Sequence, residues 1–210
     1  MLDAIGRCGI VPVIKITDVA KAVPLARALL TGGVGVIEVT FRTAAAPEAI
    51  AAIARKVPEM LVGAGTVLTP EQLAAAKDAG ARFIVSPGLD ADIVKKAQAD
   101  GLTVIPGVVT PSEICAALKL GLTALKFFPA QTFGGAAAIK ALAAPFAGVR
   151  FVPTGGIGQN NAPDYWKIPQ VLAVGGTWMA PEHLIDQGDF DTIERMAAEA
   201  ARLRRECGAC

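Results

Sequence analysis

Lys126 lies inside an apolar run, Ala124–Pro129, that has the length of a β-strand. Charged side chains are rarely buried without a partner or a task. Burial removes hydration and so disfavours an ammonium, whereas a neutral lysine amine attacks carbonyl carbon and forms a Schiff base. The structural alternative is a strand-end lysine that extends its amine to water past an apolar stem. This segment alone leaves both interpretations open.

A carboxylate and a guanidinium follow in the apolar run Val34–Phe41 and just after it. Alternate side chains of a strand share a face, so Glu38 and Arg42 point the same way, and the apolar side chains between them point the other way. Such a pair could transfer a proton and bind an anion. The alternative is a buried ion pair that holds the strand end.

Glycines mark the ends of three further runs. Gly63 and Gly65 precede Thr66, and glycine at these positions would let a ligand approach the backbone closely. Gly-Gly pairs follow the last two runs, at 155–156 and 175–176. Backbone N–H groups in turns after the last two strands of a barrel commonly bind phosphate, although paired glycines also simply allow tight turns.

All these residues fall at the carboxyl ends of apolar runs that alternate with Ala-rich helical stretches. The runs are continuous rather than alternating, which is typical of parallel strands buried on both faces. The predicted strands are Ile10–Ile16, Val34–Phe41, Leu61–Val67, Arg82–Pro87, Thr103–Val109, Ala124–Pro129, Arg150–Thr154 and Val171–Trp178. The predicted helices are Asp18–Leu30, Pro47–Lys56, Pro70–Ala79, Asp90–Ala99, Pro111–Leu120, Gly135–Ala143 and Phe190–Arg205.

Eight such units predict an α/β fold, a (β/α)8 barrel, as one domain over residues 1–210. A short helix before Ile10 would close the bottom of the barrel. An open doubly wound sheet is the alternative, but the first strand is not followed by a Gly-x-Gly-x-x-Gly turn.

Composition narrows the function classes. Of the 210 residues 53% are hydrophobic, and 20 basic residues face 19 acidic ones, so nucleic-acid binding is not indicated. We expect no membrane span, no signal peptide and a cytoplasmic protein. The sole histidine, His183, is expected at the surface. Cys207 and Cys210 have C-x-x-C spacing without a second pair, and no cluster has metal-ligand spacing, so no metal is predicted.

Seven segments together resemble a known family over residues 9–200. They are Val11–Ile14, Glu38–Thr43, Val62–Leu68, Ser86–Gly88, Lys126–Ala130, Pro153–Ile157 and Gly175–Trp178. The chain is similar to the bacterial 2-keto-3-deoxy-6-phosphogluconate (KDPG) aldolases, which also act on 4-hydroxy-2-oxoglutarate. The resemblance implies a class I aldolase on a (β/α)8 barrel, without metal or cofactor, usually a homotrimer. Its partner would be a small 2-keto acid sugar phosphate.

The resemblance also implies roles. Lys126 matches the Schiff-base lysine and Glu38 the general acid/base. The pyruvate end matches Arg42, Thr66, Pro87, Phe128 and Thr154. Thr154 matches a family residue that influences stereochemical preference. The phosphate end matches Gly155, Gly156, Gly176 and Thr177, with Lys15 as a further anion contact.

This chain departs from the family pattern at Gln131, and at Thr177 and the loop Gly158–Asp164 of the phosphate end. Three other functions stay open from the residues. One is a galactonate-type aldolase. Another is a phosphate-binding isomerase or epimerase that uses Glu38 as base and Lys126 only as a charge. The last is a non-catalytic sugar-phosphate-binding protein.

Overall fold

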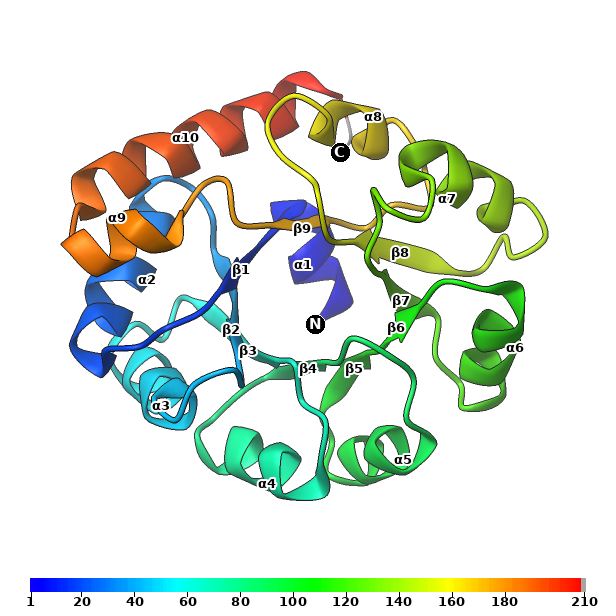
Figure 1. Ribbon diagram of the computed structural model, residues 1–210, viewed down its shortest axis with the longest axis horizontal. Helices are drawn as coiled ribbons and strands as arrows, with labels where there is room; N and C mark the ends of the chain where they lie inside the picture. The colour runs from blue at the N-terminus through cyan, green and yellow to red at the C-terminus, as the bar shows by residue number, and fades with distance from the viewer. Residues whose placement is uncertain (209–210) are drawn as a thin grey trace.

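The computed structural model describes residues 1–208, so Cys210 of the C-x-x-C spacing lies outside the described residues. Parallel strands form a ring and helices surround it (Figure 1). The strands are β1 (Ile10–Ile14), β2 (Val36–Thr40), β3 (Leu61–Gly65), β4 (Phe83–Val85), β5 (Thr103–Ile105), β6 (Gly107–Val108), β7 (Ala124–Phe127), β8 (Arg150–Pro153) and β9 (Val174–Gly176).

Two sheets make up the ring. One has the order β5-β4-β3-β2-β1-β9 and the other β6-β7-β8. Only Pro106 separates β5 from β6, and its carbonyl accepts a hydrogen bond from the Lys126 N–H at 2.8 Å, so these two short strands fill one place in the ring. The bridges Phe151–Val171 and Thr154–Gly175 close the ring between β8 and β9. The predicted (β/α)8 barrel is therefore confirmed.

The helices follow the strands as predicted, with small shifts at their ends. They are α1 (Leu2–Cys8), α2 (Ala22–Thr31), α3 (Ala46–Lys56), α4 (Pro70–Asp78), α5 (Ala91–Ala99), α6 (Pro111–Lys119), α7 (Gly135–Ala143), α8 (Ala162–Trp166), α9 (Glu182–Gln187) and α10 (Phe190–Glu206), with a 3₁₀ turn at Val19–Lys21. Thr69 and Thr110 cap α4 and α6 with their side chains, and a proline follows each. Residues 158–164, expected as a loop, contain the start of α8.

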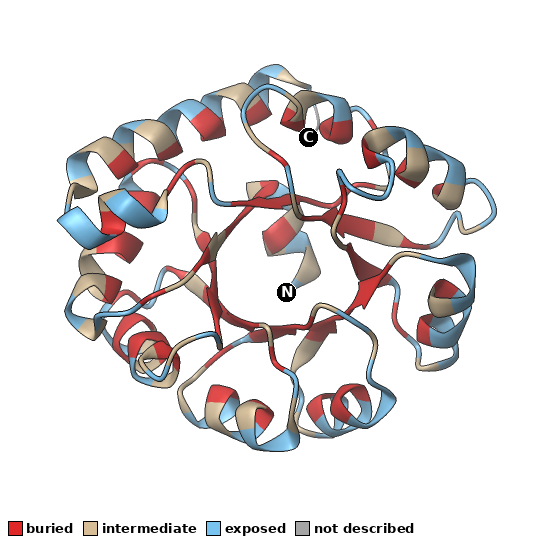
Figure 2. Cartoon of the chain, viewed as in Figure 1, coloured by how far each residue is buried: buried red, intermediate tan, exposed pale blue. Residues whose placement is uncertain are grey.

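Two buried apolar clusters hold the barrel. The larger lies between the strands and the inner faces of the helices, where burial concentrates in Figure 2. The smaller fills the barrel interior at the first residues of several strands, and it includes Val11, Val36, Phe83 and Ile5 of α1. Gly9 (φ 70°) ends α1 directly before β1, so α1 lies across the amino ends of the strands. The predicted closing helix is confirmed.

None of the helices within residues 1–208 is long and apolar enough to cross a bilayer.

Candidate active site

Lys126 and Glu38 meet inside the barrel. Lys126 lies on β7 and Glu38 on β2, and at least three ring positions separate these strands in either direction, so the contact crosses the interior. The Lys126 amine donates to Glu38 Oε1 at 3.4 Å, and both residues are at most 5% exposed. The snorkelling alternative for Lys126 is therefore wrong. The amine is held within reach of one carboxylate, which can exchange protons with it or with a group bound to it.

Gly65 makes room for the Glu38 carboxylate. A Cβ at Gly65 would lie 2.1 Å from Glu38 Oε1, and one at Gly63 would lie 2.3 Å from the Phe83 ring. We expected these glycines to admit a ligand, and that expectation is corrected: side chains of the barrel interior occupy the space. Glycine at 65 thus lets Glu38 lie flat against β3 with its carboxylate directed at Lys126.

Replacing Gly65 with Ala should displace Glu38 and lower kcat. Even modest misplacement of a reacting group can cost about 10²-fold. Overpacking of a filled interior also costs about 1–3 kcal/mol in the free energy of unfolding. Gly148→Ala is the control, because no atom lies within 4 Å of a Cβ built there. Activity and thermal melting of both variants measure the effect; unchanged kcat in Gly65→Ala would show that Glu38 tolerates the shift.

Phe128 contacts the Lys126 side chain, and Pro87 packs against the strand that pairs with β7. The Lys126 amine is 5.2 Å from the centre of the Phe128 ring, a distance at which a cation and an aromatic face attract. Gly107 pairs in register with Lys126, and a Cβ there would lie 2.0 Å from the Pro87 carbonyl oxygen. The Pro87 turn is therefore pressed against the strand next to β7. Both predicted wall residues are half-buried, Phe128 at the end of β7 and Pro87 against the neighbouring strand β6.

Thr66 has a strained backbone. Its φ is 57°, and it is the one non-glycine residue with positive φ within residues 1–208. Left-handed backbone is costly for a β-branched residue, and such strain concentrates at functional sites. Thr66 follows Gly65 directly at the end of β3, so the strain lies next to the Glu38 carboxylate. Its position supports the predicted substrate contact.

Arg42 lies beyond the end of β2 and so does not share a strand face with Glu38, contrary to the predicted alternation. β2 ends at Thr40, and the Arg42 N–H donates to the Thr40 carbonyl at 2.8 Å, so the chain turns and the guanidinium is exposed. The buried Glu38–Arg42 pair considered from the sequence is replaced by the Glu38–Lys126 pair. Arg42 instead lines a cavity of about 140 Å³ together with Lys15 and Thr177.

The turn after β8 is built around its glycines. Gly155 (φ 102°) and Gly156 (φ 73°) have backbone that other residues rarely adopt. Asn161 holds this turn, since its Nδ2 donates to the Gly156 carbonyl at 3.0 Å and its Oδ1 accepts from the Gly158 N–H at 2.8 Å. A Cβ at Gly156 would lie 2.7 Å from the Gln131 side chain.

Gln131 also joins this turn to α8. The Tyr165 hydroxyl donates to Gln131 Oε1 at 2.6 Å. Burial, with a smaller contribution from the Asp164 charge, raises the pKa of Tyr165, so the hydroxyl keeps its proton. Sequence reasoning noted Gln131 and the loop after Gly158 only as departures from a family pattern, and their partnership through α8 was not foreseen.

The strand after α8 completes the glycine-rich side of the site. Thr154 is 5% exposed, and a Cβ at Gly175 would lie 2.2 Å from its hydroxyl oxygen. Gly176 is similarly close to the Trp178 ring, whereas Thr177 is exposed. Gly155 and Gly156 form the turn after β8, as predicted, whereas Gly175 and Gly176 belong to β9 and pair with β1, so the turn predicted there is corrected. Thr177 follows directly at the carboxyl end of β9.

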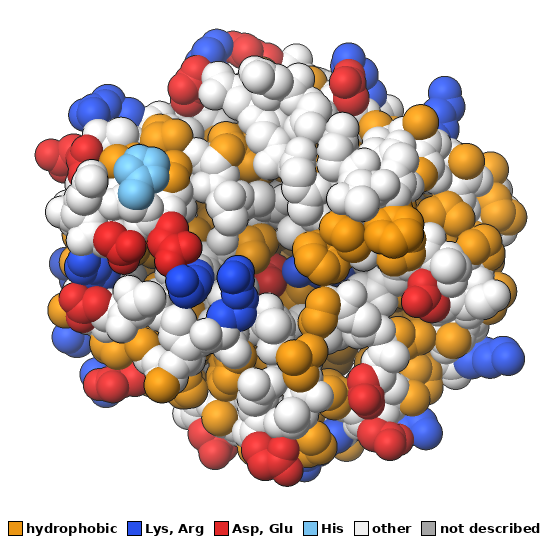
Figure 3. Space-filling view, viewed as in Figure 1, with side chains coloured by type: hydrophobic (Ala, Val, Ile, Leu, Met, Phe, Trp, Pro, Cys, Tyr) orange, Lys and Arg blue, Asp and Glu red, His pale blue; other side chains and the backbone are white. Residues whose placement is uncertain are grey.

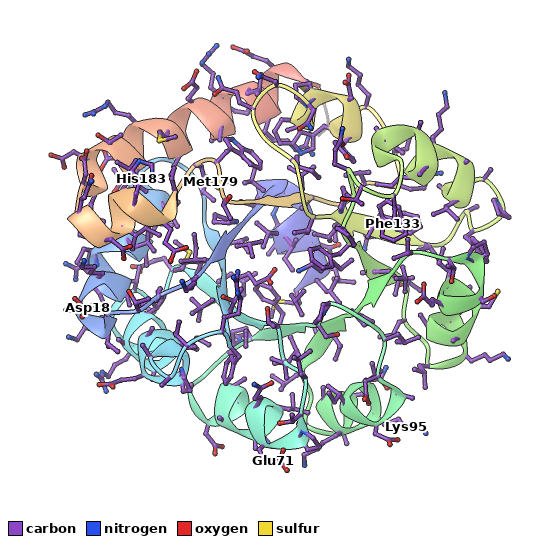
Figure 4. All side chains as sticks on the ribbon, viewed as in Figure 1. Asp18, Glu71, Lys95, Phe133, Met179 and His183 are labelled. Atoms are coloured by element: carbon purple, nitrogen blue, oxygen red, sulfur yellow. The ribbon has the colours of Figure 1, made fainter. Side chains whose placement is uncertain are left out.

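The mouth of the barrel is charged on one side and apolar on the other. Figure 3 shows a central hollow with acidic and basic side chains meeting at one rim and hydrophobic side chains at the opposite rim. Figure 4 labels His183 on α9 and Phe133 before α7, on opposite sides of the ring. His183 is exposed, as predicted, and Phe133 is 52% exposed. No group of three His, Cys, Asp or Glu within residues 1–208 is placed to hold a metal.

A closed parallel barrel with a lysine amine buried against a carboxylate has the geometry of a barrel enzyme that can form a Schiff base. Comparison with known proteins gives the family. The family described as "KDPG and KHG aldolase" matches residues 3–196, and the chain belongs to that family.

Individual relatives agree along nearly the whole chain. The KHG/KDPG aldolase of Escherichia coli K12 is 49% identical over 191 residues, which are 91% of this chain and 90% of the relative. The crystal structure of 2-keto-3-deoxy-6-phosphogluconate aldolase from Zymomonas mobilis ZM4 with 3-phosphoglycerate has 45% identity and a TM-score of 0.88, with 95% and 94% of the chains covered. KDPG aldolase from Legionella pneumophila, with pyruvate captured as a covalent carbinolamine, has 38% identity and a TM-score of 0.91, covering 95% and 97%.

Proposed function

We propose that this chain is a Schiff-base aldolase that cleaves KDPG to pyruvate and glyceraldehyde 3-phosphate. It would also cleave 4-hydroxy-2-oxoglutarate to pyruvate and glyoxylate. The observation that carries the proposal is the buried Lys126 amine, 3.4 Å from Glu38 Oε1 and fixed by strands on both sides. The covalent pyruvate carbinolamine of the Legionella relative supports the same chemistry here.

Each residue of the pair would have one task. The Lys126 amine attacks the C2 ketone, and loss of water gives an iminium that withdraws electrons. Glu38 takes the proton of the C4 hydroxyl as the C3–C4 bond breaks. The electron pair of that bond moves into the iminium and forms an enamine. The aldehyde leaves, C3 of the enamine is protonated, and water hydrolyses the resulting pyruvate iminium and frees Lys126.

The substrate's two anionic ends would bind on either side of this pair. Arg42 and Thr66 are proposed to bind the carboxylate. A guanidinium can pair with a carboxylate through two N–H groups. Thr66 follows Gly65, which packs against the Glu38 side chain. The phosphate is proposed to bind the turn at 155–156 and the end of β9 at Gly176 and Thr177, with Lys15 nearby. The cavity lined by Lys15 and Thr177 supports an anion site at this rim.

Pyruvate release from three substrates tests the function. KDPG, its C4 epimer 2-keto-3-deoxy-6-phosphogalactonate and 4-hydroxy-2-oxoglutarate are compared side by side. Protein pretreated with pyruvate and borohydride is the control. We expect release from KDPG and from 4-hydroxy-2-oxoglutarate, and slower release from the epimer. Substrate turnover without pyruvate would favour an isomerase or epimerase instead, and faster cleavage of the epimer would favour the galactonate-type assignment.

The assembly belongs to the same proposal. We infer a homotrimer of single-domain chains spanning residues 1–210, in line with the family resemblance, and light scattering of the purified protein measures its mass.

A further inference from the structure

An acidic side chain stands among the basic ones at the rim of the site. Lys15 follows β1 and Glu182 is the first residue of α9, and the Lys15 amine donates to Glu182 Oε1 at 2.6 Å. Both side chains are partly exposed, at 32% and 50%. Figure 3 shows acidic and basic side chains in contact at this rim of the hollow.

The pair lies in a cavity suited to an anion. Lys15, Arg42 and the Thr177 hydroxyl line the cavity of about 140 Å³, and Glu182 is the one acidic residue of that lining. The volume is that of several water molecules, at about 30 Å³ each, which suffices for an anionic group. The Lys15 hydrogen bond, with the charges of Lys15 and Arg42, lowers the pKa of Glu182, so its carboxylate is charged at neutral pH.

Other contacts already hold α9 in place. The Thr17 hydroxyl donates to Asp186 Oδ1 at 3.5 Å, and the Lys21 amine donates to the Asp186 carbonyl oxygen. Both tie α9 to the segment after β1 without using Glu182. Loss of the Glu182 charge should therefore leave the helix where it is, so that a change in substrate use can be separated from a change in structure.

We propose that Glu182 is a specificity-determining residue whose carboxylate competes with the phosphate of the substrate for Lys15. The inference rests on the proposed function. A phosphate monoester carries about 1.5 to 2 negative charges at pH 7, and a distal carboxylate carries one and lies closer to the reacting carbons. Repulsion by Glu182 therefore weakens binding of KDPG more than binding of 4-hydroxy-2-oxoglutarate. It thereby reduces the difference in affinity between the two substrates.

Glu182→Gln tests the competition because it removes the charge and keeps the shape. Exposed charge interactions are worth up to about 1 kcal/mol, so we expect the KM for KDPG to fall about two- to five-fold. The kcat for KDPG should stay unchanged, as should the kcat and KM for 4-hydroxy-2-oxoglutarate. Glu182→Asp keeps the carboxylate and should keep the wild-type KM for KDPG. Glu206→Gln is the matched control, because Glu206 forms a 2.6 Å pair with Arg202 on α10, with a similar exposure of 54%.

Two results would overturn the proposal. One is an unchanged KM for KDPG in Glu182→Gln. The other is a loss of thermal stability with poorer use of both substrates, which would make the pair a structural clamp. Calorimetry with inorganic phosphate, on wild type and Glu182→Gln, needs no turnover: tighter binding by the variant supports the competition, and equal binding contradicts it. Failure of the proposed function would show itself separately, as no pyruvate release by the wild-type chain.

Discussion

Lys126→Arg should lose aldol cleavage by more than about 10³-fold, because removal of a covalent nucleophile is among the most costly changes in an enzyme. Arginine keeps a positive charge beside Glu38, so the variant avoids leaving a buried carboxylate unpaired, a defect worth about 3–5 kcal/mol. The amine of Lys126 lies 3.4 Å from Glu38 and is almost fully buried, so no other lysine is expected to replace it.

Borohydride reduction in the presence of pyruvate measures Schiff-base formation at Lys126 directly. Mass spectrometry of the digested wild-type chain should place a reduced pyruvate adduct on the peptide that contains Lys126, and the Arg variant should give none. Lys15 is the informative comparison, since it lies at the same mouth but is paired with Glu182 at 2.6 Å. An adduct on Lys15, or substantial turnover by Lys126→Arg, would remove Lys126 from the Schiff-base role.

Glu38→Gln should still trap pyruvate on Lys126 but lose about 10²–10⁴-fold in kcat, the usual contribution of general acid–base catalysis. Glutamine keeps the size of the side chain beside Gly65, so the fold should be retained. Steady-state kinetics and borohydride trapping on the same preparation separate the two steps. Near-normal turnover would contradict the acid/base role, and loss of trapping would show that Glu38 is needed earlier, for attack on the ketone.

Much of the barrel could be predicted because its signals are local. Continuous apolar runs indicated buried parallel strands, and Thr-Pro pairs at 69–70 and 110–111 marked the starts of helices that the structure confirms. Alternation along β2 correctly separated Glu38 from the outward apolar side chains. The strand pattern misplaced Arg42, because the turn after Thr40 depends on a backbone hydrogen bond that periodicity does not encode.

Pairings between distant segments were not predictable in the same way. Lys126 and Glu38 are 88 residues apart, and Lys15 and Glu182 are 167 apart. Residues at strand ends could be assigned to one rim, but which side chain contacts which depends on the closure of the ring. Gly65 shows the same limit: the sequence marked a need for space, and the structure alone identifies Glu38 as the side chain that fills it.

The helix α1 covers the barrel at the amino ends of its strands. Ile5 is fully buried among the first interior residues of the strands, so within residues 1–208 α1 and its apolar neighbours cover that end of the barrel. We therefore expect substrate and both products to enter and leave at the carboxyl ends of the strands. In the proposed reaction pyruvate stays covalently attached until the aldehyde has departed, which makes product release ordered, with the phosphorylated fragment first and pyruvate last. In the synthetic direction the same covalent chemistry requires pyruvate to bind to Lys126 before the aldehyde adds.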